Sequence, residues 1–155
     1  MIPGQSRKIS DENGAALMLE RPYSLLIIDD EPGICDIIDS VISRQFKNDL
    51  NLVSTTSGKE ALEHLENEEF HIVVTDLNIP DHSGYDIARK AWDQSRSTQV
   101  IFVTGHVEMP VFTTCLREGA AAIIYKPINP EHLIKVVNMC MERFDFWNYA
   151  YDHQL

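Results

Sequence analysis

The feature that most constrains the fold is a repeated alternation of short apolar runs with segments of helical periodicity. The first run, Leu25–Ile28, has no polar residue, as is typical of a strand covered on both faces. Between residues 34 and 46, apolar side chains recur at the spacing of an amphipathic helix. Four further strands are expected in LNLVS (50–54), HIVVTD (71–76), VIFVT (100–104) and AAIIY (121–125). Strands that alternate with helices predict an α/β fold, a parallel sheet with helices on both faces.

Local signals set the ends of several helices. Ser57 and Glu60 form a capping box at the start of the second helix. Gly119 is expected to end the fourth helix, and Asn129 caps the fifth, with Pro130 at its first position.

The 155 residues are expected to form one domain with two extensions. Residues 1–22 are a polar leader, which is either flexible or packed as an extension. Within it SDENGAALMLE favours a short helix, although Gly14 disfavours one. Residues 23–144 form the domain, and residues 145–155 are an aromatic extension of the last helix.

Charge and cysteine content narrow the class of protein. The net charge is −11, which argues against a general nucleic-acid-binding surface. Cys35, Cys115 and Cys140 are far apart and indicate neither a zinc site nor a disulfide framework, so a reducing compartment is expected. The first ten residues lack an apolar signal core, and no apolar run approaches membrane-spanning length. We therefore expect a cytoplasmic protein that does not contact membranes.

Polar residues at the carboxyl ends of the expected strands form a candidate site, because ligands bind at this edge of such sheets. Asp29 and Asp30 follow the first strand, Asp76 ends the third, and Thr104 and Lys126 end or follow the fourth and fifth. Clustered carboxylates repel one another unless a hard cation lies between them, and Mg²⁺ prefers oxygen ligands. The pattern predicts a Mg²⁺ site at Asp29 and Asp30. Asp76 is placed as a nucleophile that forms an acyl phosphate, with Thr104 and Lys126 beside the phosphoryl oxygens.

Four stretches, LLIIDDEP, VVTDLNIPDHSGYD, IFVTG and AAIIYKPI, resemble the receiver domain of bacterial two-component response regulators. The resemblance covers about Ser24 to Phe144. It implies a flavodoxin-like, doubly wound (βα)5 fold similar to chemotaxis regulators, with a five-stranded parallel sheet in the strand order 2-1-3-4-5. It also implies that Asp76 accepts a phosphoryl group from a histidine kinase or a phosphotransfer partner. Asp30 would bind Mg²⁺ directly and Asp29 mainly through water, with the Asn78 carbonyl completing the protein ligands.

The same resemblance assigns a switch, and the sequence departs from the family there. Thr104 would move toward the phosphoryl group, Lys126 would pair with that group, and the Lys126–Pro127 peptide bond would be cis. Receivers often carry an aromatic residue three positions before the lysine, where this chain has Ile123. His106 occupies a position that tunes phosphoryl lifetime in the family.

Two other functions compete with a phosphorylation-controlled signalling module. One is a Mg²⁺-dependent phosphohydrolase with an aspartyl-phosphate intermediate, but the adjacent Asp29–Asp30 pair does not supply the D-x-D motif of the haloacid type. The other is a phosphorylation-independent interaction module, which the intact Asp, Thr and Lys set disfavours. We expect no metabolic enzyme activity beyond self-phosphorylation and self-dephosphorylation.

The last helix carries an apolar seam that continues beyond the part needed to cover a sheet. Its members recur at spacings of four, three, four, three and four, which favours a partner helix. Phe144 and Trp147 are expected to form an exposed patch unless the leader, a second subunit or an output domain covers them. We expect self-association, as a homodimer through this helix, and the alternative is a helix end that folds back on its own domain. The seam residues are Leu133, Val137, Cys140, Phe144, Trp147 and Tyr151.

Overall fold

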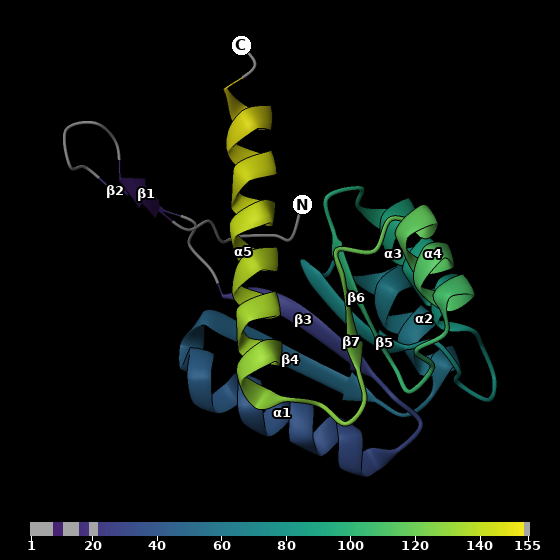
Figure 1. The fold of residues 1–155 in the computed structure, drawn as a ribbon. Helices are drawn as coiled ribbons and strands as arrows, with labels where there is room; N and C mark the ends of the chain where they lie inside the picture. Colours follow the sequence, from purple (N-terminus) through teal and green to yellow (C-terminus); the bar gives the residue numbers. More distant parts are fainter. Residues whose placement is uncertain (1–7, 11–15, 19–21, 154–155) are drawn as a thin grey trace.

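The computed structural model describes residues 8–10, 16–18 and 22–153, and a five-stranded parallel sheet forms its centre (Figure 1). The spatial order β4-β3-β5-β6-β7 corresponds to 2-1-3-4-5 when these five strands are numbered among themselves. The predicted doubly wound α/β fold is therefore confirmed. The strands are β3 (Tyr23–Ile28), β4 (Leu50–Thr55), β5 (Ile72–Asp76), β6 (Gln99–Thr104) and β7 (Ala122–Tyr125).

Helices cover both faces of the sheet, because each strand of the interior is apolar on both sides. One apolar core lies between the sheet and helices α1 and α5, and a second lies between the sheet and α2, α3 and α4 (Figure 1). Within the described ranges, none of the helices is both long and apolar enough to span a bilayer. The helices are α1 (Pro32–Phe46), α2 (Gly58–Asn67), α3 (Gly84–Gln94), α4 (Met109–Glu118) and α5 (Pro130–Asp152), with a 3₁₀ turn η1 (Lys47–Asp49).

The predicted helix ends are confirmed, but one capping residue makes a different contact from the one expected. Gly119 adopts a left-handed conformation (φ 101°) at the end of α4, and the side chain of Asn129 accepts a hydrogen bond from the His132 amide at the start of α5. The Ser57 hydroxyl accepts from the Glu60 amide, as a capping box requires. The Glu60 carboxylate, however, accepts from the Thr55 hydroxyl at 2.7 Å. Glu60 therefore ties α2 to the end of β4.

Two short strands precede the sheet and pair with each other. β1 (Lys8–Ser10) and β2 (Ala16–Met18) are antiparallel, with Lys8 opposite Met18. The short helix considered for SDENGAALMLE does not form at Ala16–Met18, because backbone pairing with β1 overrides the weak local helix preference. The remainder of the predicted leader up to residue 21 lies outside the described residues.

Candidate functional site

The candidate site lies where β3, β5, β6 and β7 end. β4 and β5 flank β3 on opposite sides, so the strand order reverses beside β3, and this switch point is where ligands bind in such sheets. Asp29 and Asp30 follow β3, Asp76 is the last residue of β5, and Thr104 is the last residue of β6. The structure thus places all the predicted strand-end residues at one edge.

Three carboxylates meet at this edge. One oxygen from each of Asp29, Asp30 and Asp76 lies within 4.8 Å of the other two. Asp29 and Asp76 are buried, whereas Asp30 is exposed. Burial raises the pKa of Asp29 above its ordinary value, although a hydrogen bond from the Glu31 amide and the Lys126 ammonium favour the charged form. The negative charges of the cluster therefore repel one another unless a cation lies close to them.

Lys126 provides part of that compensation. Its Nζ lies 2.9 Å from Asp29 Oδ2, 2.9 Å from Asp76 Oδ2, and 3.6 Å from the carboxylate of the exposed Glu31. Partial burial lowers the pKa of Lys126, but hydrogen bonds and charge from Asp76 and Asp29 outweigh burial and hold the pKa above its ordinary value. The side chain is therefore a fixed cation between two buried carboxylates.

Backbone groups also position side chains of the candidate site. The Asn78 amide donates to Asp76 Oδ1 at 3.0 Å, and the Lys126 amide donates to the Thr104 carbonyl at 2.8 Å. The Thr104 hydroxyl is fully buried and accepts from the His106 amide at 3.0 Å. The Lys126–Pro127 peptide bond is cis, as the sequence resemblance implied.

The residues present fit a divalent cation. All three clustered side chains are carboxylates, the oxygen ligands that Mg²⁺ prefers. Asp29 Oδ2 is fully buried, and although the Lys126 ammonium is close, this oxygen has no hydrogen bond of good geometry. With three negative charges and one positive, Asp29, Asp30, Asp76 and Lys126 leave a formal charge of −2 for a divalent ion to balance.

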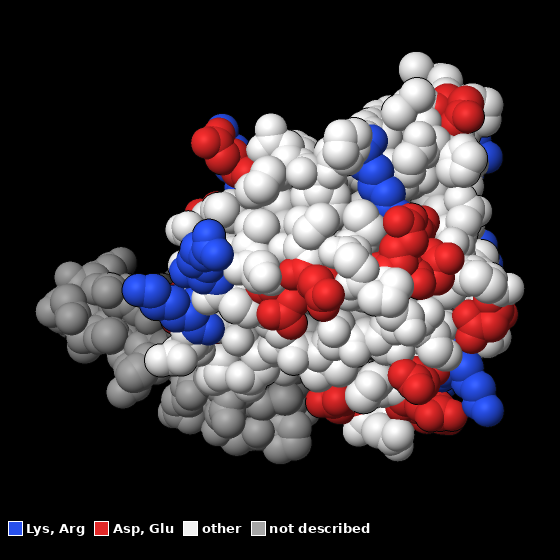
Figure 2. All heavy atoms as spheres, turned by 90° about the horizontal axis from the view of Figure 1, so that it is seen from below, with Lys and Arg blue, Asp and Glu red and all other residues white. Residues whose placement is uncertain are grey.

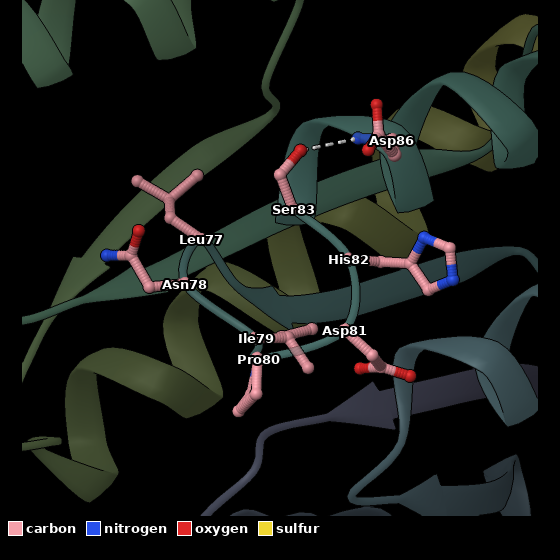
Figure 3. A pocket seen from close by; sticks show the side chains of 8 residues that line it. All are labelled: Leu77, Asn78, Ile79, Pro80, Asp81, His82, Ser83 and Asp86. Carbon is pink, nitrogen blue, oxygen red and sulfur yellow. Dashed lines mark hydrogen bonds between the residues drawn. The ribbon is translucent and has the colours of Figure 1, made fainter.

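The loop after Asp76 is held by contacts that the sequence reading did not foresee. The Asp81 carboxylate accepts from the amides of Gly58 (3.0 Å) and Lys59 (2.9 Å) at the start of α2. An acidic residue facing a helix start in another segment leaves no local sequence signal. Residues 77–83 and Asp86 line an open pocket on this loop (Figure 3).

A glycine permits the loop to return close to Asp76. A Cβ at Gly84 would lie 2.2 Å from the carbonyl oxygen of Asp76, and the Gly84 amide donates to the Leu77 carbonyl at 2.8 Å. Any side chain there would collide with backbone. Gly84 therefore fixes how α3 begins beside Asp76.

We expect Asp81→Asn to lower the thermal midpoint by a few degrees at neutral pH, because a neutral amide caps α2 less well. The hydrogen bond from the Lys59 amide holds the pKa of Asp81 below its ordinary value. Its contribution is thus present above the unfolded pKa and is lost as the pH falls through the lower, folded value. The difference from wild type should shrink below about pH 4. Glu66→Gln, at an exposed position of α2, is the control and should change little.

At the position where receivers often carry an aromatic residue, this chain has Ile123. Ile123 is half-buried and packs on the core formed with α2, α3 and α4, whereas Tyr125 is exposed. The His106 side chain is 57% exposed, and its Nδ1 lies 3.6 Å from the Glu108 carboxylate. An aliphatic side chain thus occupies the position that is often aromatic.

Charge on one outer face agrees with an acidic protein. Figure 2, which views the molecule from below relative to Figure 1, shows several separate groups of Asp and Glu on this face. Lys and Arg side chains lie in a few other places, without a continuous basic stripe across the view (Figure 2).

Comparison with known proteins identifies the family. The model of the response regulator receiver domain matches residues 25–138. The chain is 32% identical over 126 residues to Response regulator SaeR of Staphylococcus epidermidis, a match that covers 81% of this chain and 53% of SaeR. This chain belongs to the response regulator receiver domains of two-component systems. It spans about half the length of the curated relatives it matches.

Solved structures agree with this assignment. The BeF3-activated DrrB receiver domain is 26% identical, with a TM-score of 0.71 over 78% of this chain and 98% of that chain. The signal receiver domain of an HD domain-containing protein from Pseudomonas fluorescens Pf-5 has a TM-score of 0.74 at 19% identity, and covers 88% of this chain and 96% of its own. The latter similarity supports the fold alone.

Proposed function

We propose that this chain is a phosphorylation-controlled receiver in which Asp76 accepts one phosphoryl group from a histidine kinase or a phosphotransfer protein. The observation that carries the proposal is the placement of Lys126 Nζ at 2.9 Å from both Asp76 and Asp29. A fixed ammonium beside a buried carboxylate at a sheet switch point suits a group that must receive, hold and release a phosphoryl anion. We place this activity in the cytoplasm, where a kinase would supply the phosphoryl group.

The transfer uses Asp76 as the nucleophile. A carboxylate oxygen of Asp76 forms a bond to phosphorus while the P–N bond of a phosphohistidine breaks, and the imidazole nitrogen leaves with the electron pair. The Asn78 amide and the Lys126 ammonium contact different oxygens of the Asp76 carboxylate, so both orient it for attack. Asp76 is largely shielded from water, which slows hydrolysis of the acyl phosphate.

Asp29, Asp30, Asp76 and the backbone carbonyl of Asn78 would hold Mg²⁺, with Asp30 as a direct ligand and Asp29 acting mainly through water. When bound, Mg²⁺ would neutralise negative charge on the transferring phosphoryl group.

Thr104 would transmit the change. On phosphorylation its hydroxyl would give up the hydrogen bond that it accepts from the His106 amide and would donate one to a phosphoryl oxygen. The end of β6 would shift with it. Ile123 would repack where other receivers move an aromatic ring. The response would pass to an output domain or to a binding partner, and the chemistry of this chain would be limited to gaining and losing its own phosphoryl group.

Incubation with Mg²⁺ and a small phosphodonor tests the proposal against a phosphohydrolase. We expect one phosphoryl mass per chain and almost no turnover of added phosphoesters, because the acyl phosphate is shielded. Intact-mass spectrometry and a phosphate-release assay measure the two quantities. Rapid multiple turnover would support the phosphohydrolase, and an unmodified chain under every donor would support a phosphorylation-independent module.

A further inference from the structure

The loop between Asp76 and α3 is anchored at its base. The Gly84 amide donates to the Leu77 carbonyl at 2.8 Å and closes the loop. The side chains of Leu77 and Ile79 are buried in the core formed with α2, α3 and α4, whereas Asn78 between them is exposed. The base therefore holds the neighbours of Asn78, and the freedom left to the Asn78 carbonyl depends on what holds the tip of the loop.

Asp81 holds the tip of this loop against the start of α2. Its Oδ1 accepts from the Gly58 amide at 3.0 Å, and its Oδ2 accepts from the Lys59 amide at 2.9 Å and from the Ser57 hydroxyl at 3.4 Å. In Figure 3 the Asp81 side chain points away from Asp86, which lies in the first turn of α3. Both carboxylate oxygens are thus engaged by another segment, in hydrogen bonds strengthened by the negative charge.

The loop and the helix approach each other so closely that a side chain at Gly58 would collide with the loop. A Cβ there would lie 2.9 Å from Asp81 Oδ1 and 2.9 Å from the Cβ of His82. Glycine has no Cβ and permits this approach. The contact therefore depends on two residue types, a carboxylate on the loop and a glycine at the start of the helix.

The start of α2 is also tied to the opposite side of the acidic cluster. The Thr55 hydroxyl donates to the Glu60 carboxylate at 2.7 Å and accepts from the Ser57 amide at 3.1 Å. The Thr55 carbonyl accepts from the Asp29 amide at 3.3 Å. These contacts connect Asp29 through the end of β4 to the segment that Asp81 binds. Asp81 therefore completes a path of contacts from one side of the cluster to the loop on the other side.

Capping of α2 does not by itself require the loop. The helix has a cap of its own, because the Ser57 hydroxyl accepts from the Glu60 amide at 3.2 Å and the Ser57 carbonyl accepts from the Ala61 amide at 3.0 Å. Residue 59 is exposed, so water could bind its amide if Asp81 were absent. What the Asp81 contact adds is a fixed position for the loop.

We propose that Asp81 is a positioning residue for Mg²⁺, which holds the loop so that the Asn78 carbonyl faces the Asp29 and Asp30 carboxylates. This role rests on the proposed function, in which Asn78 is a ligand of the ion, and it adds a residue that does not touch the ion. Mg²⁺ demands nearly ideal octahedral geometry, so a ligand held loosely contributes less to its affinity. Hydrogen bonds that orient the ligands of a metal commonly change its affinity by about 10–100-fold.

Titration calorimetry with Mg²⁺, well below the thermal midpoint, tests the proposal. Asp81→Asn should weaken binding by roughly tenfold, because an amide offers one oxygen where the carboxylate offers two. Asp86→Asn is the matched control: it removes the same charge from an exposed position whose carboxylate lies 3.4 Å from Arg89 Nη1 rather than at α2. It should change the affinity by less than about twofold, because exposed charges are screened by salt.

Gly58→Ala disturbs the same contact from the side of the helix, since its methyl group would lie 2.9 Å from Asp81 Oδ1. It should also weaken Mg²⁺ binding. The double variant should bind Mg²⁺ no more weakly than Asp81→Asn alone, because both changes break one contact.

Amide hydrogen exchange in the metal-free chain gives a measurement that does not depend on the ion. The Asn78 amide donates to Asp76 Oδ1, and in Asp81→Asn its exchange should be faster by about fivefold or more, because the loop is no longer held at its tip. Faster exchange confined to the Gly58 and Lys59 amides would indicate a cap of α2 and no effect on the loop.

The possible results separate this role from the proposed function. A wild-type chain that does not bind Mg²⁺ would contradict the proposed metal site itself. If wild type binds Mg²⁺ and Asp81→Asn keeps the same affinity, the site stands and the positioning role is overturned. Equal weakening by Asp86→Asn would mean that Asp81 acts through its charge alone, which also overturns the role. A lower thermal midpoint with unchanged Mg²⁺ affinity would leave Asp81 as a cap of α2 only.

Discussion

Lys126→Met should lower the free energy of unfolding by roughly 2–4 kcal/mol at pH 7.5 without Mg²⁺. The substitution keeps an unbranched side chain one atom shorter and removes the charge that lies 2.9 Å from both Asp29 and Asp76. Those two carboxylates are 0% and 7% exposed, so solvent replaces the lost ammonium poorly.

The same change should alter the pH dependence of stability. Burial already raises the pKa of Asp29, and without the ammonium that lowers it, Asp29 should bind a proton more readily in the folded state than in the unfolded state. Protonation then stabilises the folded state, so the deficit should shrink as the pH falls toward 5. Urea unfolding at the two pH values measures it, and Lys135→Met, an exposed lysine of α5, is the control. A Lys126→Met chain as stable as wild type at pH 7.5 would show that the ammonium does not compensate the carboxylates.

Asp30→Ala should weaken Mg²⁺ binding by about 100-fold, and Asp29→Ala by about tenfold, because a direct ligand contributes more than one acting through water. Asp30 is the exposed member of the cluster, so its loss should also relieve repulsion and leave the metal-free fold as stable as wild type or more so. Titration calorimetry measures the affinity, and thermal unfolding without Mg²⁺ measures the stability.

Glu31→Ala is the matched control for this pair. Glu31 is the third acidic residue of the same run, but its side chain is 65% exposed and lies outside the carboxylate cluster. Its loss should change the affinity less than threefold. Equal effects of all three substitutions would mean that net charge alone attracts the ion, and unchanged affinity in Asp30→Ala would remove the site.

The sheet and its site edge were predictable because their determinants are periodic and local. The run Leu25–Ile28 requires burial on both faces, and a parallel order brings the residues after each strand to one edge. Asp29, Asp76 and Lys126 could therefore be grouped although the first and the last are 97 positions apart in the sequence.

Features that depend on contacts between distant segments were not predictable. Asp81 reaches the start of α2 across a loop, and no spacing rule marks such a contact. Phe144 was expected in an exposed patch, because the seam does not reveal that His71 and Tyr23 extend the domain surface under it. The pairing of β1 with β2 likewise depends on backbone hydrogen bonds that the residue types do not specify.

The most direct test of the central claim is to map the phosphoryl group on the chain. After phosphorylation by a small donor with Mg²⁺, borohydride reduction converts an acyl phosphate to an alcohol, and peptide mass spectrometry locates the reduced residue. The account predicts reduction at Asp76 alone in wild type, and none in Asp76→Asn. Reduction at Asp29, Asp30 or another residue in wild type, or equal labelling of Asp76→Asn, would contradict it.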